Sequence, residues 1–326
     1  MLDIFLLGTG GTMPLPERPL TALLVKYNGK GILIDCGEGT QTMIRKHKQS
    51  LYNIDVILIT HFHADHISGL PGLLLSCAKS ERKEPIVIIG PKGLKTVVSS
   101  LCIIAPGLPF ELVLIEIDKE EYSHIFGDIR ITAFAVDHSV PCYGYSVSID
   151  RKPRFDVQKA LALGIDKRLW KAMQNGESVT YNGAVYSPQM VLGKQRKGLK
   201  ITYCTDTRPI ESIAHYAENS DLYIGEGMYA EEEKIQKALE NKHSLFEETA
   251  LLAKKANVKR LWLTHFSPSL KEPETYLYKA ADIFPDTIIP GELESISLKF
   301  ESSDNGKLKV ELFSNLMKNQ SKTKDR

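Results

Sequence analysis

The amino-acid sequence predicts an α/β protein in which two β-sheets stack face to face and helices cover their outer faces. Strand-like apolar runs recur along the 326 residues with helical stretches between them, in two successive rounds. The runs are too apolar to leave either face of a sheet in water. Several of them end at acidic or imidazole side chains, which gives the predicted sheets a common polar edge.

The strands expected in the first half form an opening antiparallel set and a later series. Their expected ranges are residues 2–7, 22–26, 31–34, 56–60, 86–89, 110–117, 128–136 and 144–149. Tyr27-Asn28-Gly29 is a typical hairpin turn, so we expect the first three strands to pair antiparallel. Gly69-Leu70-Pro71-Gly72 indicates a turn or the start of a helix. Another helix is expected from Pro91 to about Ala105, because proline is favoured in the first turn.

The second half repeats this order of strands and helices after an irregular central segment. Strands are expected over residues 199–204, 222–225 and 260–264, and helices over 209–216, 230–239 and 245–256. From Leu316 onward the chain is polar and basic, which predicts a frayed tail over residues 316–326.

The amino-acid composition is that of an ordinary globular protein, and it limits which binding partners and which cellular location we expect. With 43% hydrophobic residues and a net charge of +1, the chain can bury a full core and must meet any polyanion through a local patch. The amino terminus does not resemble a signal peptide, and no run reaches the ~18 apolar residues of a membrane span. Five widely spaced cysteines predict reduced, packed thiols. We therefore expect a cytoplasmic protein with no membrane partner.

The strongest chemical signal is His61-Phe62-His63-Ala64-Asp65-His66, directly after the apolar run 56–60. A single histidine after a strand is ordinarily a surface residue. Three imidazoles and a carboxylate within six residues are different, because these groups are the ligands that zinc and similar ions prefer. A short loop after a strand can aim alternate side chains into one pocket. The segment therefore predicts a metal site.

Four further residues follow predicted strands in the same way. They are Asp35, His138, Asp206 and His265. Any one of them alone is more typical of a cap or a turn. Together with the histidine cluster they supply enough ligands for two metal ions.

The order of these residues resembles the metallo-β-lactamase-fold hydrolases, and within them the short form of ribonuclease Z, which removes the 3′ trailer from precursor tRNA. The histidine cluster marks the superfamily, whereas Gly37-Glu38-Gly39-Thr40-Gln41 and Asp206-Thr207-Arg208-Pro209 are typical of the ribonuclease Z branch. The resemblance runs to about Ser267. It implies an αββα sandwich of two mixed sheets, as one domain over residues 1–315 with an inserted arm at about 150–200. Other matching segments are Gly8-Thr9-Gly10-Gly11-Thr12, Gly69-Leu70-Pro71-Gly72-Leu73, Tyr143-Gly144-Tyr145 and Leu263-Thr264-His265-Phe266-Ser267.

The resemblance also implies a role for each ligand candidate. One zinc would be held by His61, His63 and His138, and the other by Asp65, His66 and His265. Asp206 would bridge the two, and Asp35 would orient ligand histidines. The carboxylate of Asp65 would also act as the base for the attacking water. These ligands suit manganese and iron as well as zinc, so the metal in the cell stays open.

The resemblance also implies that His243, in Asn241-Lys242-His243-Ser244, delivers a proton to the leaving oxygen. Glu226 would hold its imidazole. The alternative for His243 is a residue that merely begins a helix. This chain has Gly225-Glu226-Gly227-Met228 where the family usually shows a His-Glu-Ala-Thr-like segment, so only the glutamate carries over.

The inserted arm departs further from the family. Its segment 163–170 lacks the Gly-Pro-rich tip that grips the tRNA elbow in the short form. The arm nevertheless carries cations that would form a phosphate-binding surface, or else a solvated face. They are Arg151, Lys152, Arg154, Lys194, Arg196, Lys197 and Lys200.

The sequence thus predicts a di-zinc phosphodiesterase, an endonuclease that removes the 3′ trailer of precursor tRNA through metal-activated water. The resemblance also implies a homodimer. The alternative enzyme is a relative that cleaves small phosphodiesters or other esters with the same metals, which loss of the Gly-Pro tip favours. A di-iron redox protein would carry a flavin module and a glutamate in place of His63. A non-catalytic RNA-binding scaffold would not need the full ligand set.

Overall fold

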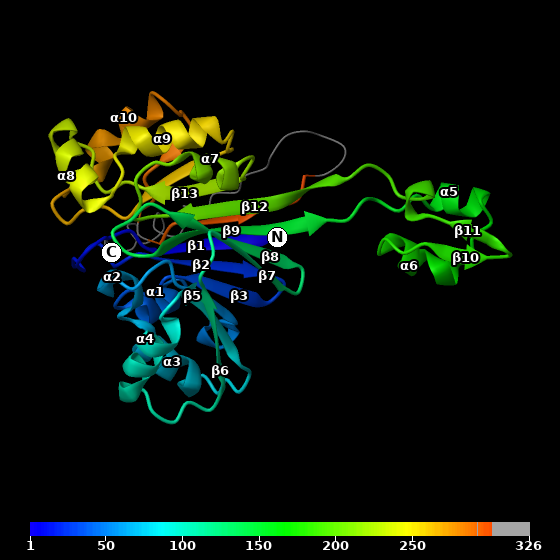
Figure 1. Ribbon diagram of the computed structural model, residues 1–326, viewed down its shortest axis with the longest axis horizontal. Helices are drawn as coiled ribbons and strands as arrows, with labels where there is room; N and C mark the ends of the chain where they lie inside the picture. The colour runs from blue at the N-terminus through cyan, green and yellow to red at the C-terminus, as the bar shows by residue number, and fades with distance from the viewer. Residues whose placement is uncertain (292, 302–326) are drawn as a thin grey trace, which may run out of the picture.

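Two seven-stranded sheets lie face to face in the computed structural model, which describes residues 1–291 and 293–301. Helices cover the outer face of each sheet (Figure 1). The predicted two-sheet α/β architecture is therefore confirmed. The predicted tail over residues 316–326 lies outside the described residues.

The first sheet holds the amino-terminal strands, in the order β16-β1-β2-β3-β4-β5-β6. β1 to β3 pair antiparallel as predicted, and Asn28 and Gly29 turn the chain between β2 and β3 with φ of 49° and 80°. β3 to β6 are parallel neighbours, so their carboxyl ends share one edge. The strands are β1 (Leu2–Gly8), β2 (Ala22–Tyr27), β3 (Lys30–Ile34), β4 (Val56–Leu58), β5 (Ile86–Pro91), β6 (Leu112–Ile117) and β16 (Ser295–Leu298).

The second sheet has the order β15-β14-β13-β12-β9-β8-β7. β12 to β15 are parallel, whereas β7, β8, β9 and β12 alternate in direction. The carboxyl ends of β8, β12, β13 and β14 therefore lie at one edge. The strands are β7 (Glu121–Phe126), β8 (Ile129–Val136), β9 (Cys142–Arg151), β12 (Arg196–Cys204), β13 (Leu222–Glu226), β14 (Leu261–Thr264) and β15 (Thr287–Ile288).

Helices from the first half of the chain cover the first sheet, and later helices cover the second (Figure 1). The first group is α1 (Thr40–Lys46), η1 (Leu51–Asn53), α2 (Ala64–Ile67), α3 (Leu70–Lys79), α4 (Leu94–Leu101) and η2 (Cys102–Ile104). The second group is α7 (Glu211–Ala217), η5 (Glu232–Lys234), α8 (Ile235–Asn241), α9 (Phe246–Lys255), η6 (Pro273–Tyr276) and α10 (Leu277–Ala281). None of the described helices has the length and apolar character needed to cross a membrane.

The main hydrophobic core lies between the two sheets. It includes the fully buried side chains of Ile4 and Leu23 from the first sheet and of Val147, Ile201 and Trp262 from the second. Burial of each such large apolar side chain contributes roughly 1.5–3 kcal/mol to the free energy of folding. This core fixes the two sheets relative to each other, so that polar side chains from both can meet at one edge.

An arm projects from the second sheet, where β9 and β12 run on together beyond the body of the molecule (Figure 1). It has a small core of its own, which contains Ala160, Ile165, Met173, Val179 and Val191. Its elements are α5 (Val157–Ala162), η3 (Lys167–Leu169), α6 (Trp170–Gln174), β10 (Val179–Tyr181), β11 (Ala184–Tyr186) and η4 (Pro188–Met190).

Three sequence expectations about elements are wrong in their detail. Pro91 ends β5, where it pairs with Ile117, and the following helix begins only after Gly93 turns the chain with a φ of 98°. The expected strand 56–60 ends at Leu58. The helix expected over 230–239 begins as η5 and becomes α-helical at Ile235.

Candidate metal centre

Side chains from both sheets meet at the edge where the carboxyl ends of the parallel strands lie. Asp35 follows β3, and the histidine cluster follows β4. His138, Asp206 and His265 follow β8, β12 and β14 of the other sheet. Open α/β sheets place their ligands at this edge. The structure brings the predicted metal ligands together there.

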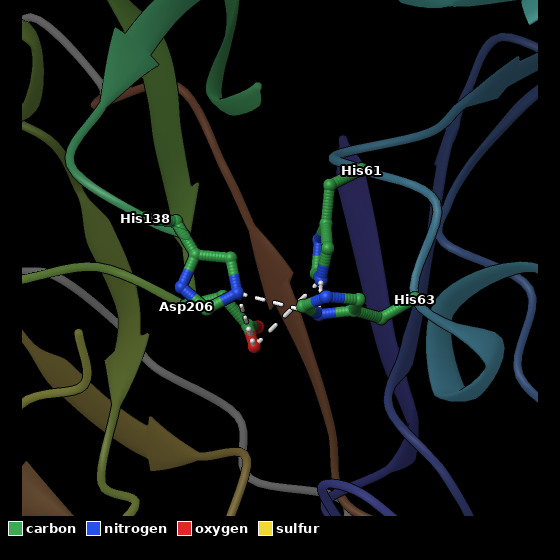
Figure 2. A group of neighbouring side chains, drawn as sticks. All are labelled: His61, His63, His138 and Asp206. Carbon is green, nitrogen blue, oxygen red and sulfur yellow. Dashed lines mark hydrogen bonds and ion pairs between the residues drawn. The ribbon is translucent and has the colours of Figure 1, made fainter. Parts of the chain in front are cut away.

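The first donor set is His61, His63, His138 and Asp206, whose side chains point toward one another in Figure 2. The His63 Nδ1 atom lies 2.9 Å from His61 Nε2 and 3.3 Å from His138 Nε2. Asp206 Oδ1 lies 3.9 Å from both of those Nε2 atoms. The turn from β4 into α2 presents His61 and His63, while His138 and Asp206 come from the opposite sheet.

The second donor set is Asp65, His66 and His265. His66 Nε2 and His265 Nε2 lie 3.2 Å apart, and Asp65 Oδ2 lies 3.5 and 3.4 Å from them. Asp206 Oδ2 is 3.2 Å from each of the two Nε2 atoms. Asp206 therefore faces one donor set with Oδ1 and the other with Oδ2.

The spacing of these donors suits divalent metal ions. Zinc–nitrogen bonds of 2.0–2.1 Å at tetrahedral angles separate two ligand atoms by about 3.3 Å. The nitrogen–nitrogen separations here are 2.9, 3.2 and 3.3 Å. Asp206 Oδ2 is buried and accepts no hydrogen bond from the described residues. A cation would satisfy that oxygen and the converging imidazole nitrogens together.

Charge leads to the same conclusion. Asp35, Asp65, Asp206 and Glu226 are all buried around the site. Within residues 1–291 and 293–301, the ion pairs of these carboxylates are made with histidine and none with lysine or arginine. Burial alone would raise the pKa of Asp206, but His265 and His66 hold it well below its ordinary value. Buried anions need nearby positive charge, which two divalent ions would supply.

Asp35 lies behind the second donor set and orients one of its histidines. Its Oδ2 lies 2.8 Å from His66 Nδ1, and its Oδ1 accepts a hydrogen bond of 2.9 Å from the Thr60 amide. The Thr60 hydroxyl also donates to Asp35. Carboxylates in this arrangement fix the ring and tautomer of a metal ligand.

Three of the residues that follow strands adopt left-handed backbone conformations. The φ angles are 60° at Asp35, 56° at Asp206 and 60° at His265. Such conformations are uncommon for residues other than glycine and cluster at functional sites. Gly11 also leaves room for His265, because a Cβ atom there would lie 2.8–3.0 Å from the imidazole ring.

Beside the donor sets, His243 is held by Glu226 at the end of β13. His243 Nδ1 lies 2.5 Å from Glu226 Oε1, while Glu226 Oε2 accepts a 2.9 Å hydrogen bond from the Ser244 amide. Burial alone would lower the pKa of His243, but the Glu226 carboxylate raises it above its ordinary value. Because Glu226 occupies Nδ1, Nε2 is the ring nitrogen left for a ligand.

A cavity of about 640 Å³ opens onto these groups. Thr12, which the sequence analysis missed as a site residue, lines it and donates its backbone amide to Asp65 Oδ2 at 2.6 Å. A backbone donor leaves no signal in residue type. Thr60 was also missed, although a hydroxyl directly before the histidine cluster is a usable signal. The other lining residues are His63, Ala64, Asp65, His138, Ser139, Asp206, Met228, Tyr229, Lys237, Glu240, Asn241, His243, His265, Ser267, Pro268 and Ser269.

The arm cations differ in their exposure and in whether other protein groups bind them. Arg154 and Lys194 are exposed, and neither has an ion pair or side-chain hydrogen bond among the described residues. Arg196 donates to the Lys152 carbonyl. The remaining cations have partners that compete with a ligand. Arg151 donates to the Glu301 carbonyl, Lys152 to Asn175, and Lys200 to the Glu218 carbonyl, while Lys197 lies 4.0 Å from Asp221.

One family model and several curated relatives match this chain. A family model described as "Anti-Pycsar protein Apyc1" matches residues 2–156. A curated relative from Agathobacter rectalis, named "Ribonuclease Z", is 54% identical over 301 residues, which cover 92% of this chain and 99% of the relative. A relative of the same name from Lachnospira eligens is 54% identical over 302 residues, covering 92% and 99%.

The fold is shared with solved structures of metallo-β-lactamase-fold proteins. The short form of human tRNase Z matches with a TM-score of 0.64 and 24% identity over 91% of this chain and 100% of that chain. The metallo-β-lactamase-fold protein YhfI from Bacillus subtilis matches with a TM-score of 0.65 and 16% identity over 90% and 99%. At these identities the likeness establishes the fold alone, and it confirms the predicted fold class.

Proposed function

Because the chain belongs to the ribonuclease Z family of metal-dependent endoribonucleases, we propose that it cleaves precursor tRNA at this centre with the help of two divalent ions. Its family relation makes it an endoribonuclease of tRNA 3′ processing. The observation that supports two ions is the placement of Asp206, whose Oδ1 faces one donor set and whose Oδ2 faces the other.

We assign His61, His63 and His138 to one ion, Asp65, His66 and His265 to the other, and Asp206 to both. Two such ions would supply a water of lowered pKa, about 7 on zinc, and would stabilise negative charge on phosphate oxygens. Zinc fits the mixed nitrogen and oxygen donors, which also suit manganese and iron. The left-handed backbone at Asp206 and His265 holds their side chains at the edge between the sheets.

Two carboxylates have distinct roles in this proposal. Asp65 lines the cavity and takes up the proton of the attacking water, while the Thr12 amide fixes its Oδ2. Asp35 is buried away from the cavity and orients His66. Asp35 is therefore a positioning residue.

His243 supplies a proton to the leaving 3′ oxygen of the ribose. Its Nδ1 is engaged by Glu226, and its Nε2 makes no hydrogen bond with the described part of the chain, which leaves Nε2 for the substrate. An alkoxide is a poor leaving group, so a positioned acid is needed in the transition state. The raised pKa of His243 keeps more of its imidazolium form near neutral pH.

The arm is the proposed RNA-binding element. It projects from the body of the molecule (Figure 1). Among the described residues, the side chains of Arg154 and Lys194 make no hydrogen bond or ion pair, and Arg196 makes one hydrogen bond, to the Lys152 carbonyl. Phosphate contacts position a nucleic acid without reading its sequence. Lys197 and Lys200 are weaker candidates, since both are engaged near β13.

We also propose a homodimer that acts in the cytoplasm. The dimer follows from the family likeness, and all five cysteines are free thiols, as suits a reducing compartment. Light scattering of the purified chain tests the dimer.

The test of the proposed function is a cleavage assay that places one precursor tRNA beside bis-p-nitrophenyl phosphate, with mature tRNA as a control. Cleavage at the 3′ trailer with much higher kcat/KM for precursor tRNA supports the proposal. Efficient cleavage of the small diester without cleavage of precursor tRNA would favour the alternative, an enzyme for small phosphodiesters, to which the arm without a Gly-Pro tip also points.

A further inference from the structure

The side chain of Arg208 lies two residues beyond Asp206 and does not line the cavity. Its guanidinium forms a two-pronged contact with Glu248, in which Nη1 donates to Oε2 at 3.0 Å and Nη2 donates to Oε1. Nη1 also donates to the backbone carbonyl of His243. Both side chains are largely shielded, with 15% of Arg208 and 22% of Glu248 exposed.

Glu248 connects this contact to the segment that carries His243. It lies in the first turn of α9, where its Oε2 accepts a 2.9 Å hydrogen bond from the Leu245 amide. Arg208 and Glu248 therefore hold the backbone on both sides of Ser244. Fork-shaped pairs between arginine and a carboxylate restrict geometry more than a point charge does.

The backbone next to Arg208 connects the same segment to a second ligand loop. The Arg208 amide donates to the Asp137 carbonyl at 3.0 Å, and Asp137 directly precedes the ligand His138. The Ser244 hydroxyl donates to the Thr207 carbonyl at 2.6 Å. One short stretch of chain thus contacts the loop of Asp206, the loop of His138 and the segment of His243.

We propose that Arg208, acting through Glu248 and the His243 carbonyl, is a positioning residue that fixes the His243 imidazole relative to Asp206. The inference rests on the proposed role of His243 as proton donor. Glu226 contacts Nδ1 of the ring and the Ser244 amide, whereas the backbone carbonyl of His243 is held by Arg208. A catalytic group displaced by about 1 Å can cost roughly 100-fold in rate.

The experiment compares Arg208→Lys and Glu248→Gln with the parent enzyme. Arg208→Lys keeps the charge but loses the fork, and Glu248→Gln keeps the shape but loses the anion. For both variants we expect kcat on precursor tRNA to fall roughly 10- to 100-fold, with KM changed by less than about threefold. Cleavage of bis-p-nitrophenyl phosphate should stay within about twofold, because p-nitrophenolate leaves without an acid. Metal content per chain should be unchanged.

The matched control is Glu247→Gln. Glu247 neighbours Glu248 in the first turn of α9 but pairs with Lys279 of α10 instead of Arg208. It should leave kcat on precursor tRNA near the parent value. The double variant Arg208→Lys/Glu248→Gln should be no slower than the slower single variant, because the two residues act as a unit.

His243→Ala, measured in parallel, separates this inference from the proposed function. If His243→Ala loses activity selectively on precursor tRNA but the Arg208 and Glu248 variants do not, the inference is wrong and the proton-donor role stands. Equal losses of these variants on both substrates, or loss of metal, would also overturn it, because Arg208 would then support the ligand loop in general. If His243→Ala itself loses activity equally on both substrates, the proton-donor role and the inference fail together.

Discussion

Removing charge from the arm should weaken the binding of precursor tRNA in a way that depends on salt. The change is the triple variant Arg154→Gln, Lys194→Gln and Arg196→Gln. Among the described residues these three cations have no carboxylate partner, unlike Lys197, which lies 4.0 Å from Asp221. Arg154→Gln and Lys194→Gln remove no side-chain hydrogen bond among the described residues, and Arg196→Gln removes one, to the Lys152 carbonyl. No ion pair within the described part of the protein is lost, so the loss of charge should act on contacts with RNA.

The size of the effect follows from counterion release. Each phosphate contact adds roughly 0.7–0.9 to the slope of log affinity against log salt. Loss of three contacts therefore flattens the slope by roughly 2.1–2.7. Between 50 and 200 mM salt, the rise in KM should then be roughly 20- to 40-fold smaller than in the parent, and roughly threefold smaller for each single variant.

The assay measures KM for precursor tRNA at four salt concentrations, with bis-p-nitrophenyl phosphate as a second substrate. The charge-matched control is Lys83→Gln, Lys95→Gln and Lys254→Gln, whose lysines are exposed and lie outside the arm. The small diester should be cleaved at the parent rate by both triple variants. A salt slope for the arm variant equal to that of the control would refute the arm as the RNA-binding element.

Three other changes test the metal centre. Asp206→Ala should reduce the metal content of protein purified without chelator from about two ions per chain to below one and abolish cleavage, because both donor sets lose a ligand; retention of both ions would contradict the shared placement. His243→Ala should keep its metal but lose ~10²–10⁴-fold in kcat on precursor tRNA, with a smaller loss on bis-p-nitrophenyl phosphate; equal losses would make His243 structural. Gly11→Ala should displace His265, since the new Cβ atom would lie 2.9 Å from its Nε2 atom, and elemental analysis should find the content reduced toward one ion per chain; unchanged metal and activity would mean that the loop yields instead.

The candidate metal donors could be proposed from the sequence because they follow predicted strands or lie in the short histidine segment after one. His265 directly follows β14, and Asp206 follows β12 after one intervening residue. β7 was not predicted because its side chains alternate between exposed and half-buried, so it lacks an apolar run. The contact of Arg208 with Glu248 could not be predicted from the sequence either, because the two residues are 40 apart in the chain and are brought together only by the fold.

The assembly of the metal centre from both sheets ties catalysis to folding. His61 and His66 follow β4 of the first sheet, whereas His138 and His265 follow β8 and β14 of the second. Ions that bind only when the sheets have docked stabilise the folded state, by about 2.7 kcal/mol for each site at a free concentration 100 times its Kd. A chain whose halves have not closed has two incomplete donor sets and nothing with which to activate water. We therefore expect the chain to cleave no RNA until the two sheets have docked. A chelator should lower its melting temperature as well as its activity.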